Sequence, residues 1–89
     1  MYPVASYFGA AIRQLRERQG WSQEILAAHA DLNRSYIGEL ERGESLASLA
    51  TIAKLAEALG LRMSELLTHA EQIAQSKNTS TNDLTPIAG

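Results

Sequence analysis

Three polar side chains on one short predicted helix have hydrogen-bonding chemistry that suits the edges of nucleic-acid bases. Arg34, Ser35 and Glu39 occupy positions i, i+1 and i+5, so on a helix they share the face opposite Ile37 and Leu40. An arginine fork donates to guanine O6 and N7, a glutamate carboxylate accepts from cytosine N4, and a serine hydroxyl can do either. These three residues are therefore candidate base-reading residues.

Four further side chains around this segment could contact a phosphate backbone. Gln23 would begin a helix, where free backbone amides and the positive end of the helix dipole attract a phosphate oxygen. Its side-chain amide could donate to that phosphate or brace the neighbouring helix. Asn33 and Tyr36 would touch the sugar-phosphate backbone, and Arg42 would add a positive charge. Such contacts set register and affinity but carry no sequence information.

Other chemistries find little support in the residue types. The chain has no cysteine, and its two histidines, His29 and His69, lack ligand spacing, so we expect no metal site. Glu39 and Glu41 are two residues apart on a helix and point to different faces, which argues against a paired acid and base. The serines are placed as helix caps without a histidine partner. We therefore expect neither an enzyme nor a bound cofactor.

The elements that must position these side chains are helices. Apolar residues recur at helical spacing, and β-branched or aromatic clusters bounded by turns are absent, which predicts an all-α fold. Serine or asparagine stands where helix N-caps are needed, and glycine stands where a left-handed residue ends a helix. The caps are Ser22, Asn33 and Ser48, and the glycines are Gly20, Gly43 and Gly60. The predicted compact five-helix bundle comprises 6–19, 23–30, 34–42, 49–59 and a helix that begins after Ser64.

The last segment of the chain has a different composition. Beyond Ser76 the sequence is polar, has few apolar anchors and contains Pro86, which predicts a disordered tail over 76–89. The folded domain is accordingly predicted to span 6–75. Within it, we expect Leu49, Ile52, Ala53, Ala56 and Leu59 to form the inner stripe of helix 49–59.

Helices 23–30 and 34–42 are joined by a turn of about three residues, the spacing of a helix-turn-helix unit over about 22–42. The segments IRQLRERQG, SQEILA, RSYIGELERG and TIAKLAEALG follow one another in order. This ordered set resembles the phage-repressor and Cro-like (XRE-type) helix-turn-helix family over about Phe8 to Leu67. The segment NRSYIGELERG is also similar to the recognition helix of restriction–modification controller proteins.

The resemblance implies a lambda-repressor-like DNA-binding domain in which helix 34–42 lies in the major groove. It places Arg34, Ser35 and Glu39 at the family's base-reading positions. It also implies an ion pair between Arg16 and Glu41, which would support the end of the recognition helix. Asp31 stands where the family often has glycine, and aspartate tolerates a left-handed conformation better than most residues.

Size and charge limit what else the chain could be. Its 89 residues fit one domain, and the formal net charge is −2. Five arginines balance five acidic residues up to Gly43, whereas three basic residues face five acidic ones beyond it. Because the half that would face DNA is neutral, we expect weak affinity for random sequences. The absence of an 18-residue apolar run or a signal-peptide pattern predicts a cytoplasmic protein that does not contact a membrane.

One inserted helix contacts few phosphates, whereas a two-fold dimer reads two half-sites about 34 Å apart. The candidate dimer surface is an apolar stripe on the fifth helix, formed by Leu67, Ala70, Ile73 and Ala74, which Leu46 and Met63 could extend. These observations predict a homodimeric, sequence-specific transcriptional regulator on a palindromic double-stranded DNA operator. The alternative is an antitoxin or another helical protein–protein interaction module with a protein partner. The acidic second half and the apolar stripe leave that alternative open.

Overall fold

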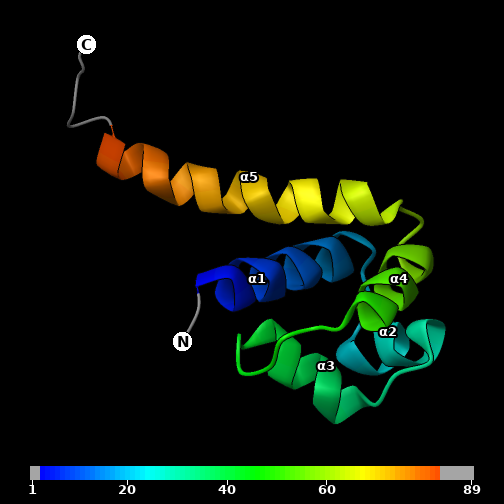
Figure 1. Cartoon of the computed structure of the whole chain (residues 1–89). Helices are drawn as coiled ribbons and strands as arrows, with labels where there is room; N and C mark the ends of the chain where they lie inside the picture. Colours follow the sequence, from blue (N-terminus) through cyan, green and yellow to red (C-terminus); the bar gives the residue numbers. More distant parts are fainter. Residues whose placement is uncertain (1–2, 83–89) are drawn as a thin grey trace.

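The computed structural model describes residues 3–82, with side chains described through residue 76. These residues form five α-helices and no strand, which confirms the predicted all-α, five-helix fold. α1 and α5 lie side by side and run in opposite directions, while α3 lies against the other side of α1 (Figure 1). α2 and α4 pack at the end where α1 stops and α5 starts. The helices are α1 Pro3–Arg18, α2 Gln23–Ala30, α3 Arg34–Glu41, α4 Leu49–Ala58 and α5 Met63–Asn82.

Local side-chain chemistry begins and ends the helices at the predicted places. The Ser22 hydroxyl accepts from the Ile25 amide at 3.2 Å and begins α2, and Ser48 accepts from the Thr51 amide at 3.1 Å and begins α4. Asp31 ends α2 with φ 56°, in the left-handed region. The glycines that follow α1, α3 and α4 also have positive φ.

Every helix contributes at least one fully buried side chain to the single core. These residues are Ile12, Leu26, Ile37, Leu40, Leu55 and Leu66. α1 approaches the end of α3 so closely that there is no room for a side chain at position 9, which is glycine. A Cβ there would overlap the carbonyl oxygen of Leu40 and lie 2.9 Å from that of Glu41. The missing side chain therefore fixes the last turn of α3 against α1.

Two helices differ from the sequence-based expectation in their bounds. α1 begins at Pro3 instead of residue 6, because proline fits the first helical position, where no backbone donor is required. α5 includes residues 76–82, which the sequence assigned to the disordered tail. No proline or glycine interrupts 76–82, so the helical backbone can continue after the apolar anchors end. The rest of the predicted tail, 83–89, lies outside the described residues.

The buried face of α4 is rotated from the expected one. Leu49 is 73% exposed and Ala53 is exposed, so the prediction that these two residues belong to the inner stripe was wrong. Leu55 is instead fully buried, and Thr51 is buried beside it on the same face. Burial of Thr51 is tolerated because its hydroxyl is within 3.1 Å of the Ser48 hydroxyl.

Candidate nucleic-acid interface

The first turn of α3 exposes two of the three predicted base-reading side chains. Asn33 uses its side-chain oxygen to accept from the Ser35 amide at 2.8 Å, and this N-cap begins the helix at Arg34. Arg34 and Ser35 are exposed, while Ile37 and Leu40 are buried on the opposite face. The apolar face of α3 thus fixes which side chains point outward.

Arg34 and Glu39 differ in how strongly other side chains of the protein hold them. The Arg34 side chain is 58% exposed, and its Nε lies 3.7 Å from Oε2 of Glu24 on α2, which is a loose ion pair. Glu39 is half-buried, and its Oε1 accepts from the Ser45 hydroxyl at 3.2 Å. Arg34 can therefore reach an approaching acceptor directly, whereas Glu39 already shares one oxygen with the loop after α3.

A buried ion pair joins α1 to the last turn of α3. Arg16 Nε and Nη2 donate to the two carboxylate oxygens of Glu41 at 2.7 and 2.9 Å, and the side chains are 12% and 5% exposed. Arg16 Nη1 also donates to the carbonyl oxygen of Trp21 at 2.8 Å. The hydrogen bonds with Glu41 raise the pKa of Arg16 above its ordinary value, and burial offsets part of that rise.

Gln23, the first residue of α2, is tied to the same carboxylate. Its Nε2 donates to Glu41 Oε1 at 3.0 Å, so the side-chain amide braces α3. One carboxylate thereby holds the start of α2, the end of α3 and, through Arg16, the last turn of α1. The structure brings together these three predicted residues, which lie far apart in sequence, and so fixes the angle between the two helices of the unit.

Tyr36 and Asn33 were predicted to contact a phosphate backbone. The Tyr36 hydroxyl donates to Thr51 Oγ1 at 3.5 Å, so the half-buried ring links α3 to α4. Asn33 is exposed at the start of α3, beside Arg34. Both residues therefore form a hydrogen bond within the protein, and both lie at the exposed start of α3.

Arg42, the C-cap of α3, has a partner that the sequence reasoning missed. Its Nε and Nη2 donate to the two carboxylate oxygens of Glu44 at 2.9 and 3.1 Å, and the side chains are 58% and 54% exposed. These hydrogen bonds raise the pKa of Arg42 and lower the pKa of Glu44 from their ordinary values. The opposite charges two residues apart were the only sequence signal for this contact.

The predicted dimer stripe divides into exposed and buried members. Leu67 is 39% exposed and Ala74 is half-buried, whereas Ala70 is only 7% exposed and belongs to the core of its own chain. Ile73 is half-buried and packs against that core. Ala70 therefore exposes little surface to a partner, although it lines a cavity between α1 and α5.

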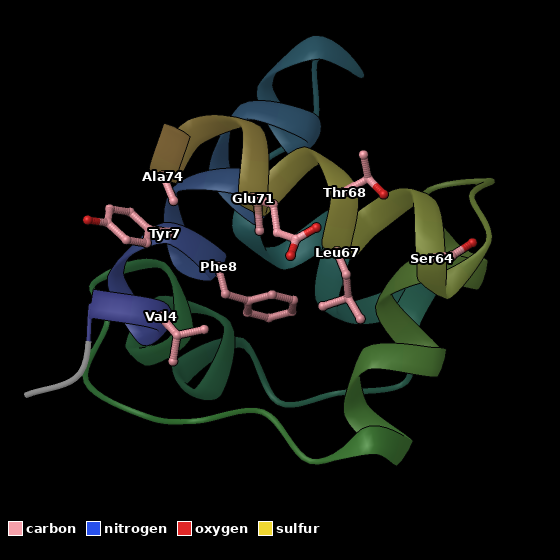
Figure 2. A pocket seen from close by; sticks show the side chains of 9 residues that line it. Val4, Tyr7, Phe8, Ser64, Leu67, Thr68, Glu71 and Ala74 are labelled. Carbon is pink, nitrogen blue, oxygen red and sulfur yellow. The ribbon is translucent and has the colours of Figure 1, made fainter. Parts of the chain in front are cut away.

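A cavity of about 490 Å³ lies between the start of α1 and the first half of α5. Figure 2 shows Phe8 and Leu67 pointing into it from opposite helices, with Val4 at its edge and the Glu71 carboxylate over it. Val4 and Leu67 also line a second hollow together with Leu46, which is 62% exposed. Leu46 is one of the residues predicted to extend the stripe, whereas sequence periodicity could not find Val4, which joins this surface only through the packing of α1 against α5.

Each histidine has a contact within the protein. The His29 ring stacks on Trp21 with centroids 4.4 Å apart, and His69 Nε2 lies 3.0 Å from Gln14 Oε1. Burial, and then the charge of Arg18, lower the pKa of His69. None of the helices in the described part of the chain has the length and apolar character to cross a bilayer.

Comparisons with known proteins match this arrangement. The helix-turn-helix family model matches residues 12–66. The control protein C.BamHI of Bacillus amyloliquefaciens is 44% identical over 61 residues, which cover 67% of this chain and 75% of that protein. The control protein C.MunI of Mycoplasma sp is 38% identical over 73 residues, which cover 81% of this chain and 99% of that one. The crystal structure of the restriction-modification controller protein C.AhdI from Aeromonas hydrophila superposes with a TM-score of 0.71 at 46% identity, covering 73% of this chain and 98% of that chain.

Proposed function

The chain belongs to the helix-turn-helix family, and we propose that it is a sequence-specific DNA-binding transcriptional regulator that acts by binding and not by catalysis. The observation that carries this proposal is the exposed Arg34–Ser35 turn on a helix whose orientation is fixed by the Arg16–Glu41 ion pair. Two relatives of similar length are control proteins, which supports a role in gene control. We place the protein in the cytoplasm, where its DNA would be.

In this proposal α3 enters the major groove with its first turn toward the base edges. Arg34 would release Glu24 and donate to a guanine, and Ser35 would contact a neighbouring base. Glu39 would accept from a cytosine amino group while it keeps or exchanges its bond with Ser45. Each of these contacts depends on the rigid placement of α3, because a hydrogen bond weakens steeply with misalignment.

Phosphate contacts would flank the inserted helix. Asn33 caps the start of α3, Tyr36 lies in its first turn, and Arg42 lies at its other end. Gln23 begins α2, so its backbone amide can face a phosphate while its side chain stays on Glu41. These contacts would set affinity and register for every sequence alike.

We further propose a homodimer on a palindromic operator, with the α1 and α5 surface as its interface. The exposed side chains of Val4 and Leu67 line two adjoining hollows there, with Ala74 of the predicted stripe in one and exposed Leu46 in the other. Ile73 of the stripe lines a separate hollow beside His69. Leu67→Glu should shift the protein to monomer in sedimentation at micromolar concentration. Leu49→Glu is the control, because Leu49 is exposed but lines neither hollow. A wild-type protein that sediments only as monomer would contradict the interface.

The test of sequence readout is Arg34→Ala against DNA selected from a random pool and against random duplexes. A loss of about 1–3 kcal/mol confined to one base position supports direct readout. An equal loss on every sequence would reduce Arg34 to a phosphate contact. Absence of DNA binding by the wild-type protein at low salt would overturn the proposed function.

The second candidate function is a helical protein–protein module, such as an antitoxin. The apolar surface between α1 and α5 favours it, because a partner protein could cover that surface in place of a second copy. Salt-insensitive binding to a protein partner, with none to DNA, would favour this alternative. Steep salt dependence of DNA binding would favour the regulator, since counterion release scales with the phosphates contacted.

A further inference from the structure

The guanidinium of Arg42 lies over the backbone of α3 beside the start of α2. A Cβ built on Gly38 would lie 3.0 Å from Arg42 Nη1 and 3.6 Å from Gln23 Oε1. The absence of a side chain at Gly38 therefore makes room for the Arg42 head group next to Gln23. An exposed guanidinium in this position can bind a phosphate through two parallel hydrogen bonds.

The Glu44 carboxylate is already hydrogen-bonded to this guanidinium. It accepts from both Nε and Nη2 of Arg42, the paired arrangement in which an arginine also binds two phosphate oxygens. Both side chains are more than half exposed, so neither burial nor packing holds them together against a competing anion. The contact is therefore one that an approaching phosphate could replace.

We propose that Glu44 acts as an intramolecular competitor for the phosphate that Arg42 would bind, and so sets the affinity of the protein for DNA of any sequence. This inference rests on the proposed function. While the pair is closed, its net charge is zero, and Arg42 releases no counterion from the DNA. A glutamate carboxylate is charged at neutral pH even at its ordinary pKa, and Arg42 lowers that pKa further, so the competitor is present under ordinary conditions.

The size of the effect follows from the exposure of the pair. An exposed ion pair weakens a competing contact by about two- to fivefold, so Glu44→Gln should tighten binding to a random duplex by that factor per protomer. Releasing Arg42 from Glu44 strengthens its phosphate contact, and the slope of log K against log salt should become steeper by up to about 0.9 per protomer. Glutamine keeps the size of the side chain and removes its charge, and the position is exposed, so the variant should fold normally.

The experiment measures binding of wild type and variants to a random-sequence duplex by fluorescence anisotropy across a salt series. Glu57→Gln is the matched control, because it removes the same charge from an exposed position on α4 with no ion pair among the described residues. The Arg42→Ala/Glu44→Gln double variant tests whether the effect passes through Arg42. Its slope should equal that of Arg42→Ala alone.

The outcomes separate this inference from the function on which it rests. A steeper slope of log K against log salt for Glu44→Gln, without the same change in Glu57→Gln or the double variant, supports the proposal that Glu44 competes for Arg42. An unchanged slope, or the same steepening in the control or the double variant, overturns it while leaving DNA binding intact. If neither wild type nor Glu44→Gln binds duplex DNA at low salt, the proposed function fails as well.

Discussion

Two arginine–glutamate pairs at the end of α3 have nearly the same chemistry and opposite surroundings. Arg16 and Glu41 are 12% and 5% exposed, while Arg42 and Glu44 are 58% and 54% exposed. In each pair two guanidinium nitrogens donate to two carboxylate oxygens, at 2.7 to 3.1 Å. Hydrogen-bond geometry alone therefore does not distinguish them.

Because the two pairs differ in solvent access, the inner pair has a structural role and the outer pair can have a functional one. A buried charge that loses its partner cannot be rehydrated, so the inner pair fixes the relative positions of α1, α2 and α3. An exposed charge exchanges its partner for water or another anion at little cost, so the outer pair can respond to DNA. Two consecutive residues, Glu41 and Arg42, thus have different roles because successive residues of a helical turn point in different directions, one toward α1 and the other toward solvent.

The largest expected effect comes from breaking the inner pair. Glu41→Ala leaves Arg16 buried without its carboxylate and should lower the free energy of unfolding by about 3–5 kcal/mol. Denaturant unfolding followed by circular dichroism measures this loss. Glu44→Ala is the matched control and should leave the unfolding midpoint almost unchanged. Equal losses of unfolding free energy in the two variants would show that the two pairs contribute equally to stability.

The next effect tests the helix contact that holds the inner pair in place. Gly9→Ala would force α1 away from the carbonyl groups of Leu40 and Glu41 and should destabilise the fold by about 1–3 kcal/mol or more. Gly38→Ala is the control, since its Cβ would meet mainly the movable Arg42 head group. Alanine also favours a helix over glycine by about 1 kcal/mol, so Gly38→Ala should be neutral or stabilising. A stable Gly9→Ala variant would show that α1 can shift without losing the pair.

The parts of this site that depend on neighbouring residues were predictable from sequence. The Ser22, Asn33 and Ser48 caps form hydrogen bonds to amides two or three residues away, and the sequence alone determines such contacts. The exposed face of α3 likewise follows from the burial of Ile37 and Leu40.

Contacts between distant segments were predictable only in part. The sequence pattern alone did not imply a bond between Arg16 and Glu41, 25 residues apart, and the pair was expected only from the family resemblance. The Glu44 contact depends on the side-chain rotamer of Arg42 and the path of the loop after Gly43, neither of which has a periodic signal. The rotation of α4 and the burial of Ala70 depend on how neighbouring helices dock.

A smaller effect should appear when the outer arginine is removed. Arg42→Ala should leave the unfolding free energy close to wild type and weaken binding to operator and random duplexes by the same factor, because a phosphate contact is not sequence-specific. Parallel unfolding and anisotropy measurements test both halves of this statement. Loss of binding at a single base position would mean instead that Arg42 reads sequence.

The smallest effect concerns the titration of the outer pair. Because Arg42 lowers the pKa of Glu44 in the folded state, the pair contributes stability above the unfolded-state pKa of Glu44 and loses it as pH falls through the folded-state value. An NMR titration of the Glu44 side-chain carboxyl should give a pKa below the ordinary glutamate value, which returns toward that value in Arg42→Ala. High salt should reduce the shift as well, because an exposed pair is screened. A depressed pKa that survives both changes would show that another group holds Glu44, and Arg42 would then be open to phosphate without competition.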